Sequence, residues 1–174
     1  ILVVIFFKFN IILIMNYFKI SIGIFIVLAT SRFVPHPPNF TSLIALSFYI
    51  PLFLGLRYLP ALIISFVVTD LFIGYHDLTH WTWGSVFLIG MISQYFNINK
   101  FYRFFGASLS VIIFFLITNF GVWTVGSYGY SFEGLISCYI LAIPFLGNNL
   151  IATFICSLII ETVRAYYKKF LQTN

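Results

Sequence analysis

Long apolar segments separated by short polar links run through most of this chain, and they constrain its fold more than any other feature. Of its 174 residues, 61% are hydrophobic and only 7% are charged, whereas a soluble domain carries roughly 25% charged residues. Because such a chain cannot cover a water-facing surface, we expect an all-α integral membrane protein. A spanning helix needs about 20 apolar residues, and the pattern predicts a bundle of six transmembrane helices. The expected spans are 20–34, 41–56, 59–74, 81–96, 105–124 and 134–163.

The last apolar segment is too long for one straight span. Pro144, Gly147, Asn148 and Asn149 interrupt it, and proline removes a helical hydrogen bond. Two alternatives stay open: one long kinked helix, or a half-helix at 134–145 followed by a span at 148–163. The backbone of a broken helix must be satisfied by protein or water inside a membrane. The interruption is therefore a candidate wall of a binding site.

The first 14 residues are an N-terminal extension of doubtful status. Met15 is followed by a lysine and then by an apolar helix, as at many bacterial starts. We therefore expect Met15 to be the native start and residues 15–174 to form a single transmembrane domain. The alternative is a signal-peptide-like extension at 1–14.

The charged residues are unevenly distributed between the two sides of the predicted spans. Lys and Arg concentrate in the cytoplasmic loops of membrane proteins, so both termini are expected in the cytoplasm of a bacterium, with the chain in its cytoplasmic membrane. On this interpretation the net charge of +5 orients the helices, and no nucleic-acid partner is expected. Asn97–Arg103 is predicted to be a polar, basic loop, and Arg32 is the one basic residue on the outer side. The cytoplasmic set is Lys8, Lys19, Arg57, Lys100, Arg103, Arg164, Lys168 and Lys169, and the outer set is His36, His76, Asp77, His80 and Glu133.

Asp70 is the most informative single residue, because it lies within a predicted span. An ionisable group at mid-span costs about 2.5–3.5 kcal/mol on insertion scales and usually faces a partner or a cavity. Arg32 and His36, at the outer end of the first span, are its candidate partners. A structural ion pair between the first and third spans and a contact with a ligand are equally consistent with the sequence.

Two histidines in the link before the fourth span raise the question of a metal site. His76 and His80 are four residues apart and would share one face of a helix, as metal ligands do. No third ligand is evident nearby, so they are weak candidates for zinc, nickel or cobalt. A solvated loop in which Asp77 and Thr79 cap the next helix is favoured.

Amide and aromatic side chains in the outer halves of the last spans indicate a pocket for an organic ligand. Asn119 within a span needs hydrogen-bond partners, and Trp123 follows it closely. Tyr139, Asn148 and Asn149 belong to the same predicted wall. The alternative for Trp123 is a simple anchor at the membrane interface.

Two kinds of site are not indicated. Cys138 and Cys156 both lie in apolar segments, so we expect packed thiols rather than a disulfide. No catalytic grouping, phosphate-binding loop or ATPase motif is evident. We therefore expect neither an enzyme nor a bound cofactor, and any ATP-driven transport would need another subunit.

Three stretches of the chain resemble a known group of bacterial membrane proteins. They are Arg32–Thr41 (RFVPHPPNFT), Asp70–His76 (DLFIGYH), and Asn119–Trp123 (NFGVW) with the following Gly134-Leu135, Cys138-Tyr139 and Ala142–Phe145. Together they are similar to an uncharacterised bacterial family regarded as related to the S components of energy-coupling-factor (ECF) transporters. The resemblance covers about residues 16–165.

The resemblance implies a six-helix protein that binds a vitamin or metal ion near the outer face. It also implies partnership with a transmembrane T subunit and two ATPases. One departure concerns docking on the T subunit, for which S components often use an Ala-x-x-x-Ala pattern in the first helix. Here the first span offers only Ser21, Gly23, Ala29 and Ser31.

We therefore expect a substrate-binding membrane subunit of an ECF-type importer, with a small solute or ion, the lipid bilayer, a T subunit and ATPases as partners. The alternatives are a membrane-embedded metal-binding protein or enzyme using His36, His76, Asp77 and His80, and a structural membrane protein without a ligand. The residues predicted to bind the substrate are Arg32, His36, Asn39, Asp70, Asn119, Trp123, Tyr139 and Asn148.

Overall fold

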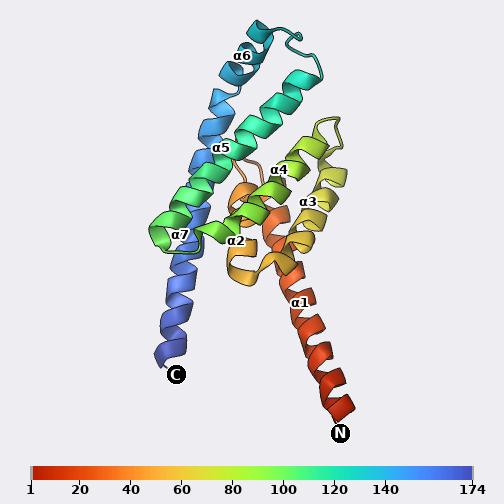
Figure 1. Ribbon diagram of the computed structural model, residues 1–174, viewed down its shortest axis with the longest axis vertical. Coiled ribbons are helices and arrows are strands. Elements are labelled where there is room, and N and C mark those ends of the chain that lie inside the picture. Colours follow the sequence, from red (N-terminus) through yellow and green to blue (C-terminus); the bar gives the residue numbers. More distant parts are fainter. Residues whose placement is uncertain (1, 174) are drawn as a thin grey trace.

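The computed structural model describes residues 2–173, and the side chains of residues 14–172. Every regular element in this range is helical, which confirms the all-α class. The helices pack as a bundle elongated along one axis, and α1 begins and α7 ends at the same end of the molecule (Figure 1). The α-helices are α1 (Leu2–Phe33), α2 (Leu43–Leu54), α3 (Leu59–Ile73), α4 (Thr79–Ile92), α5 (Lys100–Thr124), α6 (Phe132–Leu141) and α7 (Ile143–Thr173), and the 3₁₀ turns are η1 (Leu56–Tyr58) and η2 (Ser93–Phe96).

Only some of the described helices have the length that the six-span prediction required. Four segments are long and apolar enough to cross a membrane: Ile14–Phe33, Leu56–Ile73, Lys100–Thr124 and Ile143–Gln172. The predicted spans 41–56 and 81–96 instead give α2 with 12 residues and α4 with 14. At 1.5 Å per residue such helices are about 18–21 Å long, short of a hydrocarbon core of roughly 30 Å.

The last apolar segment forms two helices, as one of the two alternatives proposed. The break lies at Ala142, between α6 and α7, and not within 144–149. Pro144 explains this position, because it has no N–H to bond the carbonyl of Ile140 and is best tolerated in the first turn of a helix. Gly147, Asn148 and Asn149 then continue α7 without interruption.

The core is centred on α2, which lies between the other helices. Every residue from Leu43 to Leu52 is buried, and α2 packs against α3, α4, α5 and α7. Its largest buried side chains, Phe48 and Tyr49, form an edge-to-face pair with ring centroids 5.1 Å apart. A helix that is apolar on every side and surrounded by others explains why its sequence resembles a membrane span.

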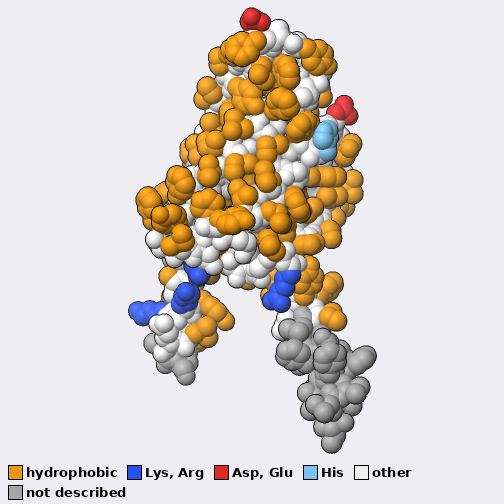
Figure 2. Space-filling view, in the orientation of Figure 1, with side chains coloured by type: hydrophobic (Ala, Val, Ile, Leu, Met, Phe, Trp, Pro, Cys, Tyr) orange, Lys and Arg blue, Asp and Glu red, His pale blue; other side chains and the backbone are white. Residues whose placement is uncertain are grey.

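Charge is separated along the long axis of the molecule. On the face seen in Figure 2, Lys and Arg side chains lie near the end where α1 begins and α7 ends, and acidic and His side chains lie toward the opposite end. One part of the charge analysis was wrong: Asn97–Arg103 is not a loop throughout. Asn99 caps α5 by accepting a hydrogen bond from the amide of Tyr102 at 3.0 Å. Arg103 is thereby placed in the first turn of α5, where it is buried.

Candidate functional site

A largely buried ion pair joins α1 to α3. It lies toward the end of the bundle away from the start of α1 and the end of α7, which we call the outer end. A guanidinium nitrogen of Arg32 lies 2.5 Å from one carboxylate oxygen of Asp70. The indole N–H of Trp83, on α4, donates to the other carboxylate oxygen at 2.6 Å. Arg32 was one of the two predicted candidate partners of Asp70, beside His36, and contact with a ligand was the equal alternative. Nothing in the sequence pointed to Trp83 as the third member. Both oxygens of the carboxylate are therefore satisfied within the protein.

Arg32 is also held by groups other than Asp70. Its guanidinium donates to the hydroxyl of Thr69 and, at 3.3 Å, to the carbonyl of Phe66. It lies over the ring of Phe66 at 4.6 Å from the centroid, an arrangement that favours a cation. These contacts join α1 to α3, and the hydrogen bond from Trp83 to Asp70 adds α4.

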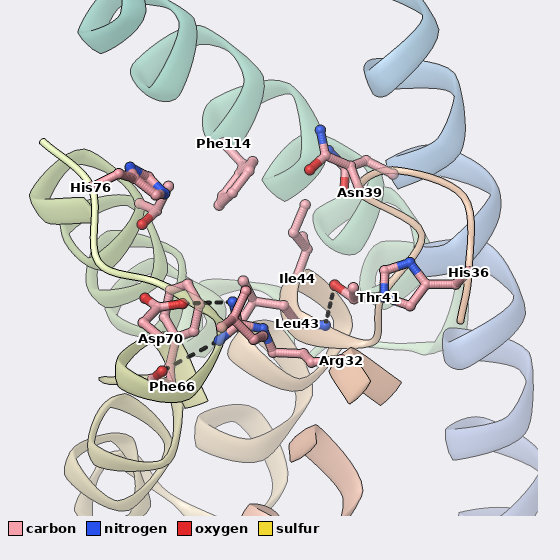
Figure 3. A pocket seen from close by; sticks show the side chains of 13 residues that line it. Arg32, His36, Asn39, Thr41, Leu43, Ile44, Phe66, Asp70, His76 and Phe114 are labelled. Atoms are coloured by element: carbon pink, nitrogen blue, oxygen red, sulfur yellow. Dashed lines mark hydrogen bonds and ion pairs between the residues drawn. The ribbon is translucent and has the colours of Figure 1, made fainter. Parts of the chain in front are cut away.

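A cavity of about 260 Å³ opens beside this pair. We call it lobe A. Its polar wall combines the loop after α1, which supplies His36 and Asn39, with Arg32 and Asp70 below them (Figure 3). His76 lies across the space on the loop after α3, and the ring of Phe114 lies between them.

A second cavity of about 290 Å³, lobe B, adjoins lobe A. It extends between α5 and α6 and is more apolar in its residue types. Asn119, Thr118 and Tyr128 are among its polar residues. Its other side chains include Phe115, Val122, Cys138, Leu141 and Phe145.

Five residues line both lobes and define their junction: Asn39, His76, Thr82, Phe114 and Asn149. Asn149 is only 6% exposed. Among the described residues, the side chains of Asn39, His76 and Asn149 have no hydrogen-bond partner. Asn149 is buried, where polar side chains are usually hydrogen-bonded, whereas Asn39 and His76 are exposed. The junction therefore offers one buried and two exposed polar groups to a molecule in the cavity.

Asn39 lies in a loop beside the cavity and has an uncommon backbone conformation. Asn39 has a φ of +62°, a left-handed conformation that asparagine adopts more readily than most residues. This turn reverses the chain between α1 and α2. The loop is tied to α7, because the side-chain amide of Asn148 donates to the carbonyl of Pro38 at 2.9 Å.

Five of the eight residues predicted to bind substrate line the two lobes. They are Arg32, His36, Asn39, Asp70 and Asn119. Within the described residues, the other three have different surroundings. Tyr139 donates to the carbonyl of Leu116 at 2.7 Å and so ties α6 to α5. Asn148 makes the loop contact described above, and Trp123 makes a tilted contact with the ring of Phe120 and an edge-to-face contact with that of Tyr130.

The two histidines considered as metal ligands are separated by the fold. His76 lies in the loop before α4 and faces the lobes, whereas His80 lies in the first turn of α4 and contacts the ring of Trp81. The hydroxyl of Thr79 bonds both backbone groups of His76, the amide at 3.1 Å and the carbonyl at 2.5 Å. No group of three His, Cys, Asp or Glu residues placed to hold a metal is found in the described part of the chain. Cys138 and Cys156 are both free thiols, as expected.

A second buried ion pair, absent from the sequence prediction, lies toward the opposite end of the bundle. Arg103 on α5 binds Glu161 on α7 through two nitrogens, at 2.5 and 2.8 Å. Arg103 had been assigned to the cytoplasmic loops on its charge. The available signal was Glu161 itself, the one acid in the last apolar segment, which needs a partner.

The fold and site together define an all-helical protein with helices of membrane-spanning length, two buried ion pairs and a two-lobed outer cavity. The chain belongs to a family described as a family of unknown function (DUF6580), whose model matches residues 14–173. No curated protein and no solved structure gave a significant match. The match agrees with the expected membership of a family without an assigned function, and the likeness to S components stays a prediction.

Proposed function

We propose that this protein is a multi-pass membrane protein that binds a small solute in lobes A and B. The observation that carries the proposal is the junction of the lobes, where the buried amide of Asn149 lies beside the exposed side chains of Asn39 and His76. None of these three side chains has a hydrogen-bond partner within the part of the chain that the structure describes. Ligand pockets combine apolar walls with a few converging polar groups. The junction has this composition, with Phe114 as its apolar member.

The two lobes favour a solute with a polar part and an apolar part. Lobe A holds most of the charged and polar side chains, and lobe B most of the aliphatic and aromatic ones. The Arg32–Asp70 pair is already satisfied by protein groups, so we assign the pair to positioning and the hydrogen bonding of the solute to the junction. This assignment moves the expected contact from Asp70 to Asn149.

The specific form of the proposal is an S-component-like subunit of an ECF importer. It is supported by the resemblance in the three stretches described above and by the place of lobe A beside the loops after α1 and α3. The Lys and Arg side chains visible in Figure 2 lie near the opposite end, where α1 begins and α7 ends. By the same distribution of charge, we propose that the protein lies in a bacterial cytoplasmic membrane with α1 beginning and α7 ending in the cytoplasm. A T subunit and two ATPases would then supply the energy.

The metal-binding alternative has less support, because the described residues offer no cluster of three ligands. The structural alternative is favoured by one observation, the complete satisfaction of Asp70 by Arg32 and Trp83. It does not account for the unpaired groups at the junction.

A thermal-stability screen tests the proposal. The purified protein in mild detergent is heated with a panel of vitamins, vitamin precursors, nucleosides and divalent metal salts. A binding solute raises the melting temperature by mass action, and Asn149→Leu should abolish that rise. The control is Asn97→Leu, at an exposed asparagine that lines neither lobe, and it should preserve the rise. Reconstitution of the responding protein with T and ATPase subunits then tests the importer. The proposal is contradicted if no compound stabilises the wild type and no solute moves after reconstitution.

A further inference from the structure

Four polar residues repeat every fourth position along the buried face of α7. They are Asn149, Thr153, Ser157 and Glu161, with exposed fractions of 6%, 3%, 1% and 4%. Side chains four residues apart lie one above the other on a helix, so these four form a continuous row along α7, which we call the file. From Asn149 to Glu161 the file rises about 18 Å, since each residue adds 1.5 Å.

The file begins at the outer cavity and ends at the inner ion pair. Asn149 lines both lobes, and Glu161 is held by Arg103. The ring of Phe53 lies against two guanidinium groups. Its centroid is 5.6 Å from the guanidinium of Arg103 and 3.9 Å from that of Arg164. The inner end is therefore covered by an aromatic ring and charged groups, and the outer end opens to a cavity.

Two hydroxyl groups, one on α7 and one on the neighbouring α2, lack hydrogen-bond partners among the described residues. The hydroxyls of Thr153 and Tyr49 are fully enclosed, and neither has a hydrogen-bond partner among the described residues. Tyr49 projects from α2 and lies near Ser157, yet the two hydroxyls do not meet the geometry of a hydrogen bond. Ser157 itself donates to the carbonyl of Thr153 at 2.7 Å, which leaves its oxygen free to accept.

Unpaired buried hydroxyls are rare because losing water without gaining another partner is unfavourable. Buried water that bonds two to four polar groups is the usual remedy. The file supplies such groups in sequence: an amide at the cavity, two hydroxyls of α7, the Tyr49 hydroxyl and a carboxylate. Ionisable residues within membrane spans typically mark routes for ions or protons.

We propose that Asn149, Thr153, Ser157 and Tyr49 form a water-filled track through which water and protons reach Glu161 from the outer cavity. The track is independent of which solute the lobes bind. It gives the Arg103–Glu161 pair a role beyond packing: the pair ends a route for water that begins at the outer cavity.

The test measures the reaction of single cysteines with Ag⁺, a small hydrophilic thiol reagent that travels with water. Ser157→Cys and Thr153→Cys are made in a background carrying Cys138→Ala and Cys156→Ala. Ser47→Cys is the matched control, because Ser47 is fully buried on α2 and donates only to its own helix, at the carbonyl of Leu43. Ser157→Cys exchanges a single atom, so it serves if Thr153→Cys fails to fold.

The expected result is that Cys at 157 and 153 reacts at least about tenfold faster than Cys at 47, since ions are strongly excluded from hydrocarbon. Adding Asn149→Phe to the Ser157→Cys variant should slow its reaction about tenfold by closing the outer entrance. Equal rates at 157 and 47 would overturn the track. A fast reaction that Asn149→Phe leaves unchanged would overturn its connection to the outer cavity.

Discussion

Arg103 on α5 and Glu161 on α7 form a two-point ion pair inside the bundle, with N–O distances of 2.5 and 2.8 Å. Both side chains are at least nine-tenths buried. The pair lies toward the basic end of the molecule, whereas Arg32 and Asp70 pair toward the other end. Each pair joins helices far apart in sequence, so the two hold the bundle together at two levels.

Breaking the inner pair should destabilise the protein strongly. Glu161→Met leaves the guanidinium of Arg103 buried without a partner, which typically costs about 3–5 kcal/mol. The measurement is unfolding in mild detergent, with Arg57→Met as the control at a basic residue outside both ion pairs. The double variant Arg103→Met/Glu161→Met should recover most of the loss. A double variant as unstable as the single one would show that packing, not charge, explains the effect.

Removing the indole donor should loosen the outer pair without breaking it. Trp83→Phe deletes the hydrogen bond to Asp70 and is expected to lower the free energy of unfolding by about 1–3 kcal/mol, the cost of an unmade bond to a buried charged group. Asp70→Asn should cost more, about 3–5 kcal/mol, because Arg32 loses its counter-charge. Thermal melts of the two variants compare these losses directly. Equal stabilities of Trp83→Phe and the wild type would contradict the described contact.

The turn at Asn39 separates backbone strain from ligand contact. Asn39→Ala should destabilise the protein by about 1 kcal/mol, because alanine resists a φ of +62°. Asn39→Gly accepts this φ and should keep wild-type stability while removing the amide from the cavity. A solute that contacts Asn39 would then stabilise Asn39→Gly less than the wild type in the same thermal assay. Undiminished stabilisation would exclude that contact.

Two helical glycines are expected to respond oppositely to alanine. A Cβ at Gly134 would overlap the backbone oxygens of Tyr128 and Gly129, whereas one at Gly147 would meet nothing within 4 Å. Gly134→Ala should therefore cost about 1–3 kcal/mol through overpacking. Gly147→Ala should stabilise α7 by about 0.5–1 kcal/mol. Melting temperatures of the two variants test this, and a change of the same sign in both would contradict the packing described around α6.

The sequence predicted the helical class and the outer ion pair because both depend on simple energetic rules. A chain with few charged residues needs lipid around it, and an acidic side chain inside a membrane span needs a partner. The sequence did not distinguish short buried helices from helices long enough to cross a membrane. The 12 residues of α2 are apolar on every side whether they face lipid or other helices.

The asparagine of α7 that lines the lobes is Asn149, one position from the predicted Asn148, for a similar reason. Asn148 and Asn149 are adjacent, and only the rotation of the helix decides which of them faces the cavity. The break at Ala142, set by Pro144, fixes that rotation and turns Asn149 inward. The repeat of Asn149, Thr153, Ser157 and Glu161 was a readable signal for the buried face, because its spacing matches one face of a helix.

The most direct measurement of the central claim is native mass spectrometry of the intact protein released from mild detergent. Wild type is compared with Asn149→Leu and with Asn97→Leu, the same change at an exposed asparagine that lines neither lobe. Asp70 is avoided, since its loss unpairs Arg32. A reproducible small adduct on the wild type and on Asn97→Leu, lost on Asn149→Leu, is the predicted result. The same spectrum for all three proteins, with no adduct or with an adduct that Asn149→Leu retains, would contradict solute binding at the junction of the two lobes.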